Sequence, residues 1–388
     1  MSIDTDTAPR APRGLAGLIV ADTGVGDVRG QEGFFHYRQY DATQVARHRT
    51  FEDAWHLVLR GTLPATRQES LEWGDTIRAA AEVTASVRDS LLETIRASSS
   101  GTPLADLRTA LSALGALTHD RPLWDLATAE RESAALRVAA GLPWLVAACH
   151  AVARGEQPRD PRPDLGYVGN YLWLVTGADP TPQQVWALSR YLILTIDHGF
   201  NNSTFTARTV ASTGADTTAC VVAALGSLSG PLHGGAPSRA LDALDAIGTA
   251  DRAAVWARAQ LAAGDRVMGF GHAIYRGLDP RSELLRETAA ELGGDTAQLA
   301  IAAENEVVAV LDEAKPGRML RANVEYYAGV VMDACGLDRT LFTPTFAVSR
   351  VVGWTAHILE QAADTKIIRP SSRYCGPAAP VPVPGSPM

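Results

Sequence analysis

Along most of the chain, apolar residues recur at every third or fourth position, which is the spacing of a helix with one buried face. Several of these segments are flanked by residues that commonly begin or end helices. One helix is predicted from Thr50 as N-cap to a stop at Gly61, and another from Thr181, followed by Pro182, to a stop at Gly199. Roughly a dozen to fifteen helices are predicted in all.

Strand-like patterning is confined to the beginning of the chain. The stretch GLIVADTGVGDVRGQEGFFHYR has β-branched runs interrupted by Gly, which predicts one or two short strands with turns. No sustained alternation follows residue 40. The predicted fold class is therefore all-α with a short N-terminal β segment. Residues 1–13 are predicted to be a disordered arm, and the Pro-rich residues 378–388 an extended tail.

Two segments rich in Gly and Pro, 226–237 and 267–281, interrupt the helical pattern. We interpret them as the borders of a second, smaller unit. The predicted domains are a large helical domain over 14–232, a small domain over 233–335, and a return to the large domain over 336–377.

The composition describes a globular protein with an ample core, because 46% of the 388 residues are hydrophobic and 20% are charged. The net charge of −8 argues against nucleic-acid binding as the main function. The four cysteines are far apart and form no CxxC pair, so neither a disulfide framework nor a zinc site is expected. With no signal core and no apolar run near the ~18 residues of a membrane span, a cytoplasmic location without membrane contact is predicted.

Three histidines stand in places suited to chemistry. His233 precedes a predicted helix, whose N-terminus disfavours a positive charge, so it is predicted to be a neutral hydrogen-bond donor. His198 is predicted to end its helix, where the dipole favours a more positive ring. His272 lies between Gly271 and Ala273, and small neighbours let a ligand approach. A metal site would also use histidines, but no HExxH spacing is present, and no metal is expected.

Two arginines and one glutamate complete the candidate chemistry. Arg350 falls within an apolar stripe of its helix, and a buried guanidinium needs either a substrate anion or an internal carboxylate. Arg281 is in the first turn of its helix, where a bound anion would explain a cation. In RANVEYYAG, Asn323 as N-cap would place Glu325 where helix amides favour its ionised form. Glu325 is either an ordinary solvent-facing residue or a base.

The glycines of GFGHAIYR are not followed by GK[ST] and lack a strand–GxGxxG–helix context, so nucleotide hydrolysis and Rossmann binding are rejected. Anion-binding arginines, donor histidines and a carboxylate together suit condensation or proton abstraction next to a carbonyl.

Six segments carry a resemblance, in the same order and with similar separations as in one known family. They are LTIDHGFNNSTFTARTVAST, GPLHGGAPSRAL, VMGFGHAIYRGLDPRSELLR, NVEYYAG, LFTPTFAVSRVVGWTAHILEQ and IIRPSSRYCGP. The chain resembles the citrate synthase family from about Gly14 to Pro377. The resemblance implies an α-helical homodimer with a cleft between a large and a small domain. It further implies condensation of oxaloacetate with acetyl-CoA to citrate and CoA in the tricarboxylic acid cycle, with no permanently bound cofactor.

The resemblance also implies roles for individual residues. His233 matches the donor to the thioester carbonyl, Glu325 the base that removes a methyl proton, and His272 the donor to the oxaloacetate ketone. The positions that match oxaloacetate-binding residues are His198, Arg281 and Arg350, with Arg369 reaching in from the other subunit. The positions implied for CoA binding are Arg276, Lys315, Arg318 and Arg321.

The chain departs from the family pattern in several places. Glu325 stands where Asp is usual, Asn202 where a small residue is usual, and Ala273 where many bacterial members have Arg. Three alternatives therefore stay open: a 2-methylcitrate synthase that uses propionyl-CoA, a weakly catalytic ligand-binding homologue, and a metal hydrolase.

Overall fold

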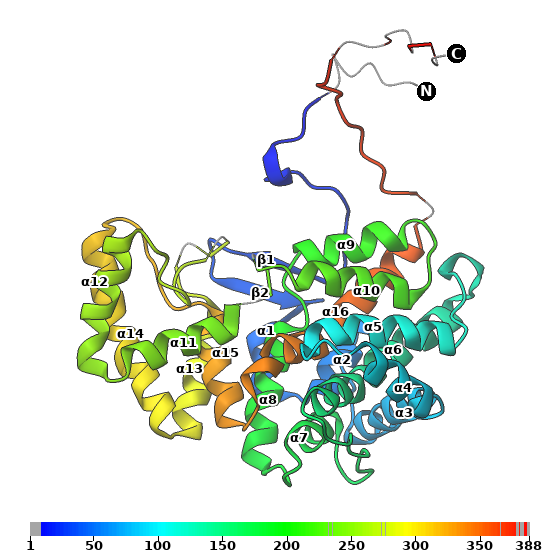
Figure 1. Cartoon of the computed structure of the whole chain (residues 1–388), viewed down its shortest axis with the longest axis horizontal. Helices are drawn as coiled ribbons and strands as arrows, with labels where there is room; N and C mark the ends of the chain where they lie inside the picture. The colour runs from blue at the N-terminus through cyan, green and yellow to red at the C-terminus, as the bar shows by residue number, and fades with distance from the viewer. Residues whose placement is uncertain are drawn as a thin grey trace.

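The computed structural model describes residues 9–231, 233–234, 236–272, 274–275, 277–364, 366–377, 380 and 384–385, with the side chains of 236–239 left out. Within these residues the protein has sixteen α-helices and one small three-stranded sheet (Figure 1). This confirms the predicted fold class. The first eight α-helices are α1 (Ala42–His48), α2 (Phe51–Arg60), α3 (Arg67–Ala85), α4 (Arg88–Ser98), α5 (Pro103–Leu117), α6 (Thr128–Ala153), α7 (Tyr167–Thr176) and α8 (Pro182–Thr195).

The second eight α-helices are α9 (Asn202–Ala211), α10 (Thr217–Leu228), α11 (Ala236–Ile247), α12 (Ala253–Ala263), α13 (Pro280–Leu292), α14 (Asp295–Ala314), α15 (Val324–Ala334) and α16 (Phe342–Ala362). Single 3₁₀ turns lie at Arg13–Leu15, Leu123–Asp125, Ala250–Arg252 and Arg339–Leu341.

The sheet is an antiparallel meander of β1 (Gly26–Arg29), β2 (Phe34–Tyr37) and β3 (Tyr40–Asp41). Gly26 pairs with Tyr37 and Arg29 with Phe34. The alternation of β2 buries Phe35 and Tyr37 against the helices, as expected for a strand with one covered face.

The N-caps predicted at Thr50, Thr181 and Asn323 are confirmed. The Thr50 hydroxyl accepts the Asp53 N–H, and the Thr181 hydroxyl accepts the Gln184 N–H. Gly61 ends α2 with φ +87°, a conformation that glycine adopts at little cost.

The predicted end of α8 at Gly199 was wrong, because the helix ends at Thr195. Tertiary contacts explain the difference. The Tyr37 hydroxyl donates to Ile193 O at 2.6 Å, and Arg350 Nε donates to Thr195 O at 2.7 Å. These carbonyls would otherwise accept amides one turn later, so the chain leaves the helix and forms the turn 196–201.

Helices α16 and α6 lie at the centre of the hydrophobic core. Nearly all side chains of α16 are buried, and the helix packs on α2, α6, α8, α9 and α10. Helix α6 is long and apolar enough to cross a membrane, although we expected no such segment; its Ala-rich sequence reaches that hydropathy without a continuous run of large residues. Since 89% of its most apolar window is buried inside the protein, it has the surroundings of a core helix.

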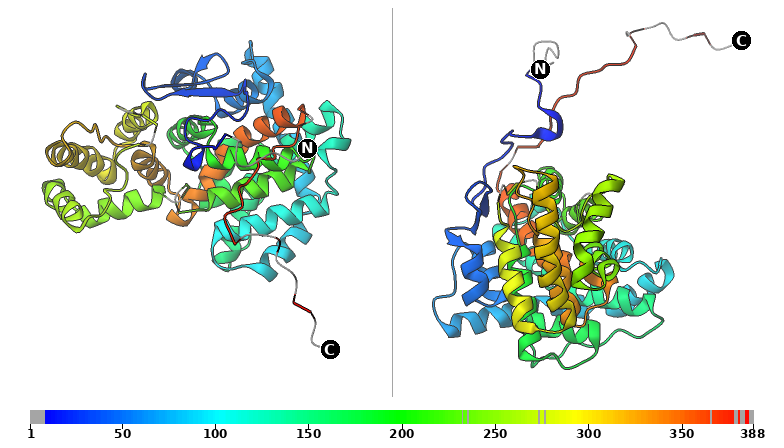
Figure 2. Two further views of the ribbon diagram at one scale, coloured as in Figure 1. Left: turned by 90° about the horizontal axis from the view of Figure 1, so that it is seen from above. Right: turned by 90° about the vertical axis from the view of Figure 1, so that its left-hand side faces the viewer.

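Helices α11 to α15 pack on one another at one end of the molecule, while α13 and α15 also contact α8 (Figures 1 and 2). Residues 1–8 of the predicted arm lie outside the described residues, and so does most of the predicted tail. Residues 9–20 and 366–377 leave the body on the same side and are almost entirely exposed.

Candidate active site

A cavity of about 540 Å³ lies where the sheet, the turn after α8, α16 and the α13–α15 region meet. Six of the candidate residues from the sequence line it together: His198, His233, His272, Glu325 and both buried arginines, Arg281 and Arg350. The N-terminal sheet supplies Asp27 and Val28, and the other lining residues are Tyr191, Thr195, Gly199, Phe200, Asn201, Gly271, Ile274, Asn323, Val324, Ala328 and Phe346.

His272 is held with a defined proton position. Its Nδ1 accepts the backbone N–H groups of Ile274 and Tyr275 at 3.0 and 3.1 Å, so the proton of the neutral ring is on Nε2. Burial and the nearby Arg281 lower the pKa of His272 to about 4. The ring is therefore neutral near pH 7. Its Nε2 atom lies 3.1 Å from Arg281 Nη2. A guanidinium has only donors, so with the ring proton on Nε2 the two groups meet as donors, and a ligand oxygen placed between them is suited to accept from both.

His233 is also neutral, as predicted, although for a different reason. Burial, together with the charge of Arg350, lowers the pKa of His233 to about 4. The ring is oriented by Ser203, whose hydroxyl is 2.9 Å from His233 Nε2 and also accepts the Trp354 indole N–H at 3.1 Å. These contacts fix the ring plane at the cavity edge.

Glu325 is in the first turn of α15, and Asn323 caps that helix by accepting the Glu325 N–H at 3.1 Å. Burial raises the pKa of Glu325 to about 7, Arg281 lowers it, and Asp279 raises it further. The predicted effect of the helix amides is therefore outweighed by burial. A carboxylate with this pKa is a stronger base than an exposed glutamate and is still partly ionised near pH 7.

Arg281 has an internal partner. Asp279 Oδ1 accepts from Arg281 Nε at 3.0 Å and Oδ2 accepts from Nη2 at 2.8 Å, and both side chains are buried. Asp279 also caps α13 and accepts the Val324 N–H at the start of α15. One carboxylate thus fixes Arg281 and joins the two helices that carry the cavity wall.

Arg350 is 2% exposed and is held differently. Its Nε donates to Thr195 O, and its guanidinium lies over the Phe346 ring at 4.7 Å from the centroid. Among the described residues, no carboxylate comes within 4 Å of Arg350. Its remaining donors are therefore suited to an anionic ligand in the cavity.

His198 contradicts its predicted charge state. It lies three residues beyond the end of α8 rather than at the helix terminus, and it is buried beside Arg281 and Arg350. Burial first, and then the two arginines, hold the pKa of His198 well below its ordinary value. The ring is neutral, and its Nε2 is 2.9 Å from the Tyr275 hydroxyl.

The other predicted residues that the structure describes do not line the cavity. Arg321 forms a bidentate ion pair with Asp312, and Lys315 and Arg318 are exposed in the segment before α15. Arg369 is exposed on the C-terminal segment that leaves the body. Arg276 lies outside the described residues. Among those described, no group of three or more His, Cys, Asp or Glu side chains is arranged to hold a metal ion.

Asp279, Asp27 and Tyr275 are polar residues at the site that were not among the predicted site residues. For Asp279, its spacing of two from Arg281 was the available signal for the ion pair. Asp27 and Tyr275 had no local signal, because only tertiary packing brings Asp27 to the cavity and the Tyr275 hydroxyl to His198.

Comparison with known proteins agrees with this arrangement. The family described as "Citrate synthase, C-terminal domain" matches residues 14–371. "Citrate synthase 2" of Bacillus subtilis is 35% identical over 370 residues, covering 95% of this chain and 96% of the relative. "2-Methylcitrate synthase" of Mycobacterium tuberculosis is 35% identical over 379 residues, covering 96% and 92%.

Solved structures give the same answer. Citrate synthase from Pyrobaculum aerophilum has a TM-score of 0.83 at 33% identity and covers 96% of this chain and 94% of its own. Citrate synthase from Thermoplasma acidophilum, in a ternary complex with carboxymethyl coenzyme A and oxaloacetate, has a TM-score of 0.85 at 26% identity, with 96% and 98% covered. The chain is therefore a member of the citrate synthase family, the acyltransferases that condense an acyl-CoA with a keto acid.

Proposed function

We propose that the protein condenses oxaloacetate with acetyl-CoA and releases citrate and CoA. The observation that carries the proposal is the meeting, in one cavity, of a glutamate of raised pKa, neutral histidines and two buried arginines. Each group supplies one requirement of the reaction: a base, donors for developing negative charge, and cations for a dicarboxylate.

Enolisation is the first step. The Glu325 carboxylate takes a proton from the methyl group of acetyl-CoA, and the electron pair moves onto the thioester oxygen. Because a thioester methyl is a very weak acid, that oxygen must be stabilised as its charge develops. His233 is suited to stabilise it because it is a neutral ring at the edge of the cavity. The Ser203 hydroxyl donates to Asn201 Oδ1 at 2.8 Å, so without substrate His233 Nε2 donates to Ser203, and donation from Nδ1 to the thioester oxygen requires the other tautomer of the ring.

Carbon–carbon bond formation is the second step. The enol carbon attacks the ketone carbon of oxaloacetate, and His272 Nε2–H donates to the ketone oxygen as it becomes an alkoxide. Arg281, Arg350 and His198 hold the substrate carboxylates and fix the geometry of attack. Water then hydrolyses the citryl thioester, which yields citrate and free CoA.

The assembly and the domain motion belong to the same proposal. We infer a cytoplasmic homodimer in which Arg369 reaches the site of the neighbouring subunit. Residues 233–335 act as a small domain that closes over 14–232 and 336–377 and excludes water. The CoA phosphates are bound by Arg276, Lys315, Arg318 and Arg321.

Steady-state release of CoA from oxaloacetate and acetyl-CoA, followed by a thiol reagent, tests this function. Turnover is expected. Binding of oxaloacetate without CoA release would instead support a ligand-binding homologue. That alternative stays open because Glu325 stands where the family usually has Asp.

Propionyl-CoA is the competing substrate, since one relative is named as a 2-methylcitrate synthase. We expect kcat/KM to be higher for acetyl-CoA by about 10- to 100-fold, because one methylene changes discrimination by roughly 1–3 kcal/mol. The measurement is kcat/KM for both thioesters at saturating oxaloacetate. A preference for propionyl-CoA would reassign the protein to 2-methylcitrate synthesis.

A shared site predicts subunit complementation. Arg369→Ala and His272→Ala homodimers should each be nearly inactive. After subunit exchange, random mixing places one intact site in half of the dimers, so about a quarter of wild-type activity should return. An Arg373→Ala variant, altered on the same segment, serves as the control. Full activity of the Arg369→Ala homodimer, or no recovery despite exchange, would contradict a shared site.

A further inference from the structure

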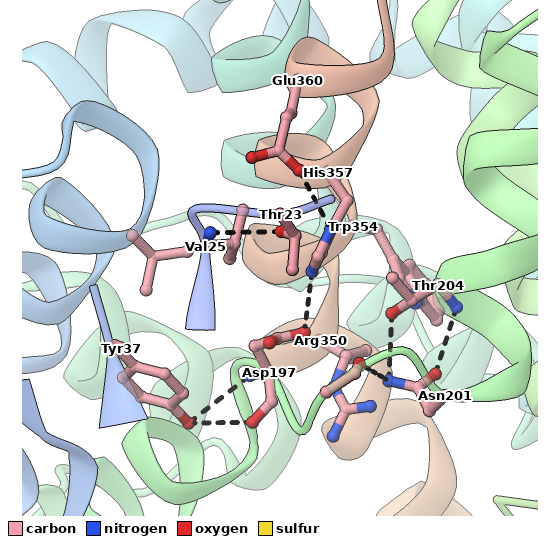
Figure 3. A network of polar contacts seen from close by, with 12 residues as sticks. Thr23, Val25, Tyr37, Asp197, Asn201, Thr204, Arg350, Trp354, His357 and Glu360 are labelled. Atoms are coloured by element: carbon pink, nitrogen blue, oxygen red, sulfur yellow. Dashed lines mark hydrogen bonds and ion pairs between the residues drawn. The ribbon is translucent and has the colours of Figure 1, made fainter. Parts of the chain in front are cut away.

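A buried polar pair lies close to residues that line the cavity (Figure 3). His357 Nε2, on α16, is 3.2 Å from Asp197 Oδ1, in the turn after α8, and each side chain is 1% exposed. Neither residue lines the cavity. Two cavity residues are nevertheless close along the chain, since His198 follows Asp197 directly and Arg350 is two helical turns before His357.

The neighbours of the pair determine its proton position. Arg208 Nη1 is 3.3 Å from His357 Nδ1, and a guanidinium has only donors, so Nδ1 accepts. Nε2 therefore carries a proton and donates it to Asp197. Glu360 forms an ion pair with Arg208 and keeps the guanidinium in place. Burial raises the pKa of Asp197, but His357 and Arg350 outweigh it, so its pKa is below the ordinary value.

Residues on one side of helix α16 contact the turn that follows α8. Arg350 Nε donates to Thr195 O, and His357 Nε2 donates to Asp197. Between them, a Cβ at Gly353 would collide with the carbonyl oxygen of the residue before Asp197, so helix and turn are in direct contact. Positions 350, 353 and 357 are spaced i, i+3 and i+7, which places them on the same side of a helix.

The opposite side of the turn is held by the sheet. The Tyr37 hydroxyl donates to Ile193 O and is 3.2 Å from Asp197 O. The backbone of the turn is thus fixed independently of His357. What His357 adds is the direction of the Asp197 carboxylate, the charged group that contributes most to raising the pKa of Arg350 against the effect of burial.

We propose that Asp197 and His357 are positioning residues for the keto-acid half of the reaction. The His357 hydrogen bond keeps the Asp197 carboxylate directed at His357, so the carboxylate does not form an ion pair with Arg350 and compete with a substrate carboxylate. This inference rests on the proposed function, in which Arg350 and His198 bind oxaloacetate.

Two amide variants of His357 test the pair. The amide of His357→Gln reaches the position of Nε2 and can still donate to Asp197, whereas the shorter amide of His357→Asn reaches only the Nδ1 side. We expect the KM for oxaloacetate to rise about 10- to 100-fold in His357→Asn and to stay within about threefold of wild type in His357→Gln. The KM for acetyl-CoA should stay unchanged in both.

Thr355→Val is the matched control for damage to α16. Thr355 is fully buried on the same helix, and within the described part of the chain its hydroxyl bonds only to Val352 O. This variant is expected to lose thermal stability and to keep the wild-type KM for oxaloacetate. A raised KM in His357→Asn at a similar thermal midpoint then identifies positioning rather than loss of structure.

The inference would be overturned if His357→Asn and His357→Gln had equal KM values for oxaloacetate, or if the KM of the control rose to the same extent. Calorimetric titration of oxaloacetate into each variant gives the same comparison without turnover. Measurements on the wild type and on the variants distinguish the two proposals. If the wild type releases no CoA, the proposed function is refuted. If the two amide variants bind oxaloacetate with equal affinity, only the role of the Asp197–His357 pair is refuted.

Discussion

Replacing Glu325 with Gln is expected to lower kcat by about 10²- to 10⁴-fold, the range usually supplied by a positioned acid or base. The amide has nearly the same shape but cannot accept the methyl proton. Oxaloacetate should still bind, because the arginines of the cavity are unchanged. Single-turnover CoA release measures the chemical step, and calorimetry with oxaloacetate measures binding. Full activity of Glu325→Gln would show that Glu325 is not the base.

The pH profile gives an independent check on the same residue. Glu325 must be ionised to act as a base, and burial raises its pKa to about 7. The value of kcat/KM should therefore fall as pH decreases through about 7 and level off above it. His233 and His272, with pKa values of about 4, stay neutral over this range. A limb centred at about pH 4.5, near the ordinary pKa of an exposed glutamate, would contradict the assignment.

Glu325→Asp serves as the conservative control. It restores the residue that is usual in the family but shortens the side chain by about 1.5 Å. A base displaced that far can lose about 10²-fold in rate. Reduced but measurable turnover in Glu325→Asp, together with its near absence in Glu325→Gln, would show that the carboxylate itself is required.

Replacing Arg350 with Gln is expected to reduce kcat/KM for oxaloacetate by about 10²- to 10³-fold, since a buried charge-assisted contact to a carboxylate is worth several kcal/mol. The loss should appear mainly as a higher KM for oxaloacetate, with little change in the KM for acetyl-CoA. Steady-state kinetics with each substrate varied in turn separates these effects.

The matched control is Arg190→Gln. Arg190 is also a buried arginine, stacked over Trp186, but it does not line the cavity. Its replacement should cost stability without changing the KM for oxaloacetate. Equal effects in the two variants would mean that Arg350 has only a structural role.

Local residue patterns were sufficient for much of the fold. Caps such as Thr50, Thr181 and Asn323 begin helices where they were predicted, because a side chain that satisfies a free amide acts within one turn of chain. The apolar stripe around Arg350 correctly predicted a buried guanidinium. The end of α8 was not predictable in this way, since Tyr37 and Arg350 take its last carbonyls from distant parts of the chain.

The sequence by itself therefore determined the helical fold class, the chemical types of the site residues and the family, because these depend on local spacing and on motifs in order. Only the tertiary structure decided the charge states and the neighbours. Burial makes His198 neutral although a helix end was expected to charge it, and it raises the pKa of Glu325 although a helix start was expected to lower it. The physical reason is that desolvation depends on everything packed around a group, and that packing is brought together from segments far apart along the chain.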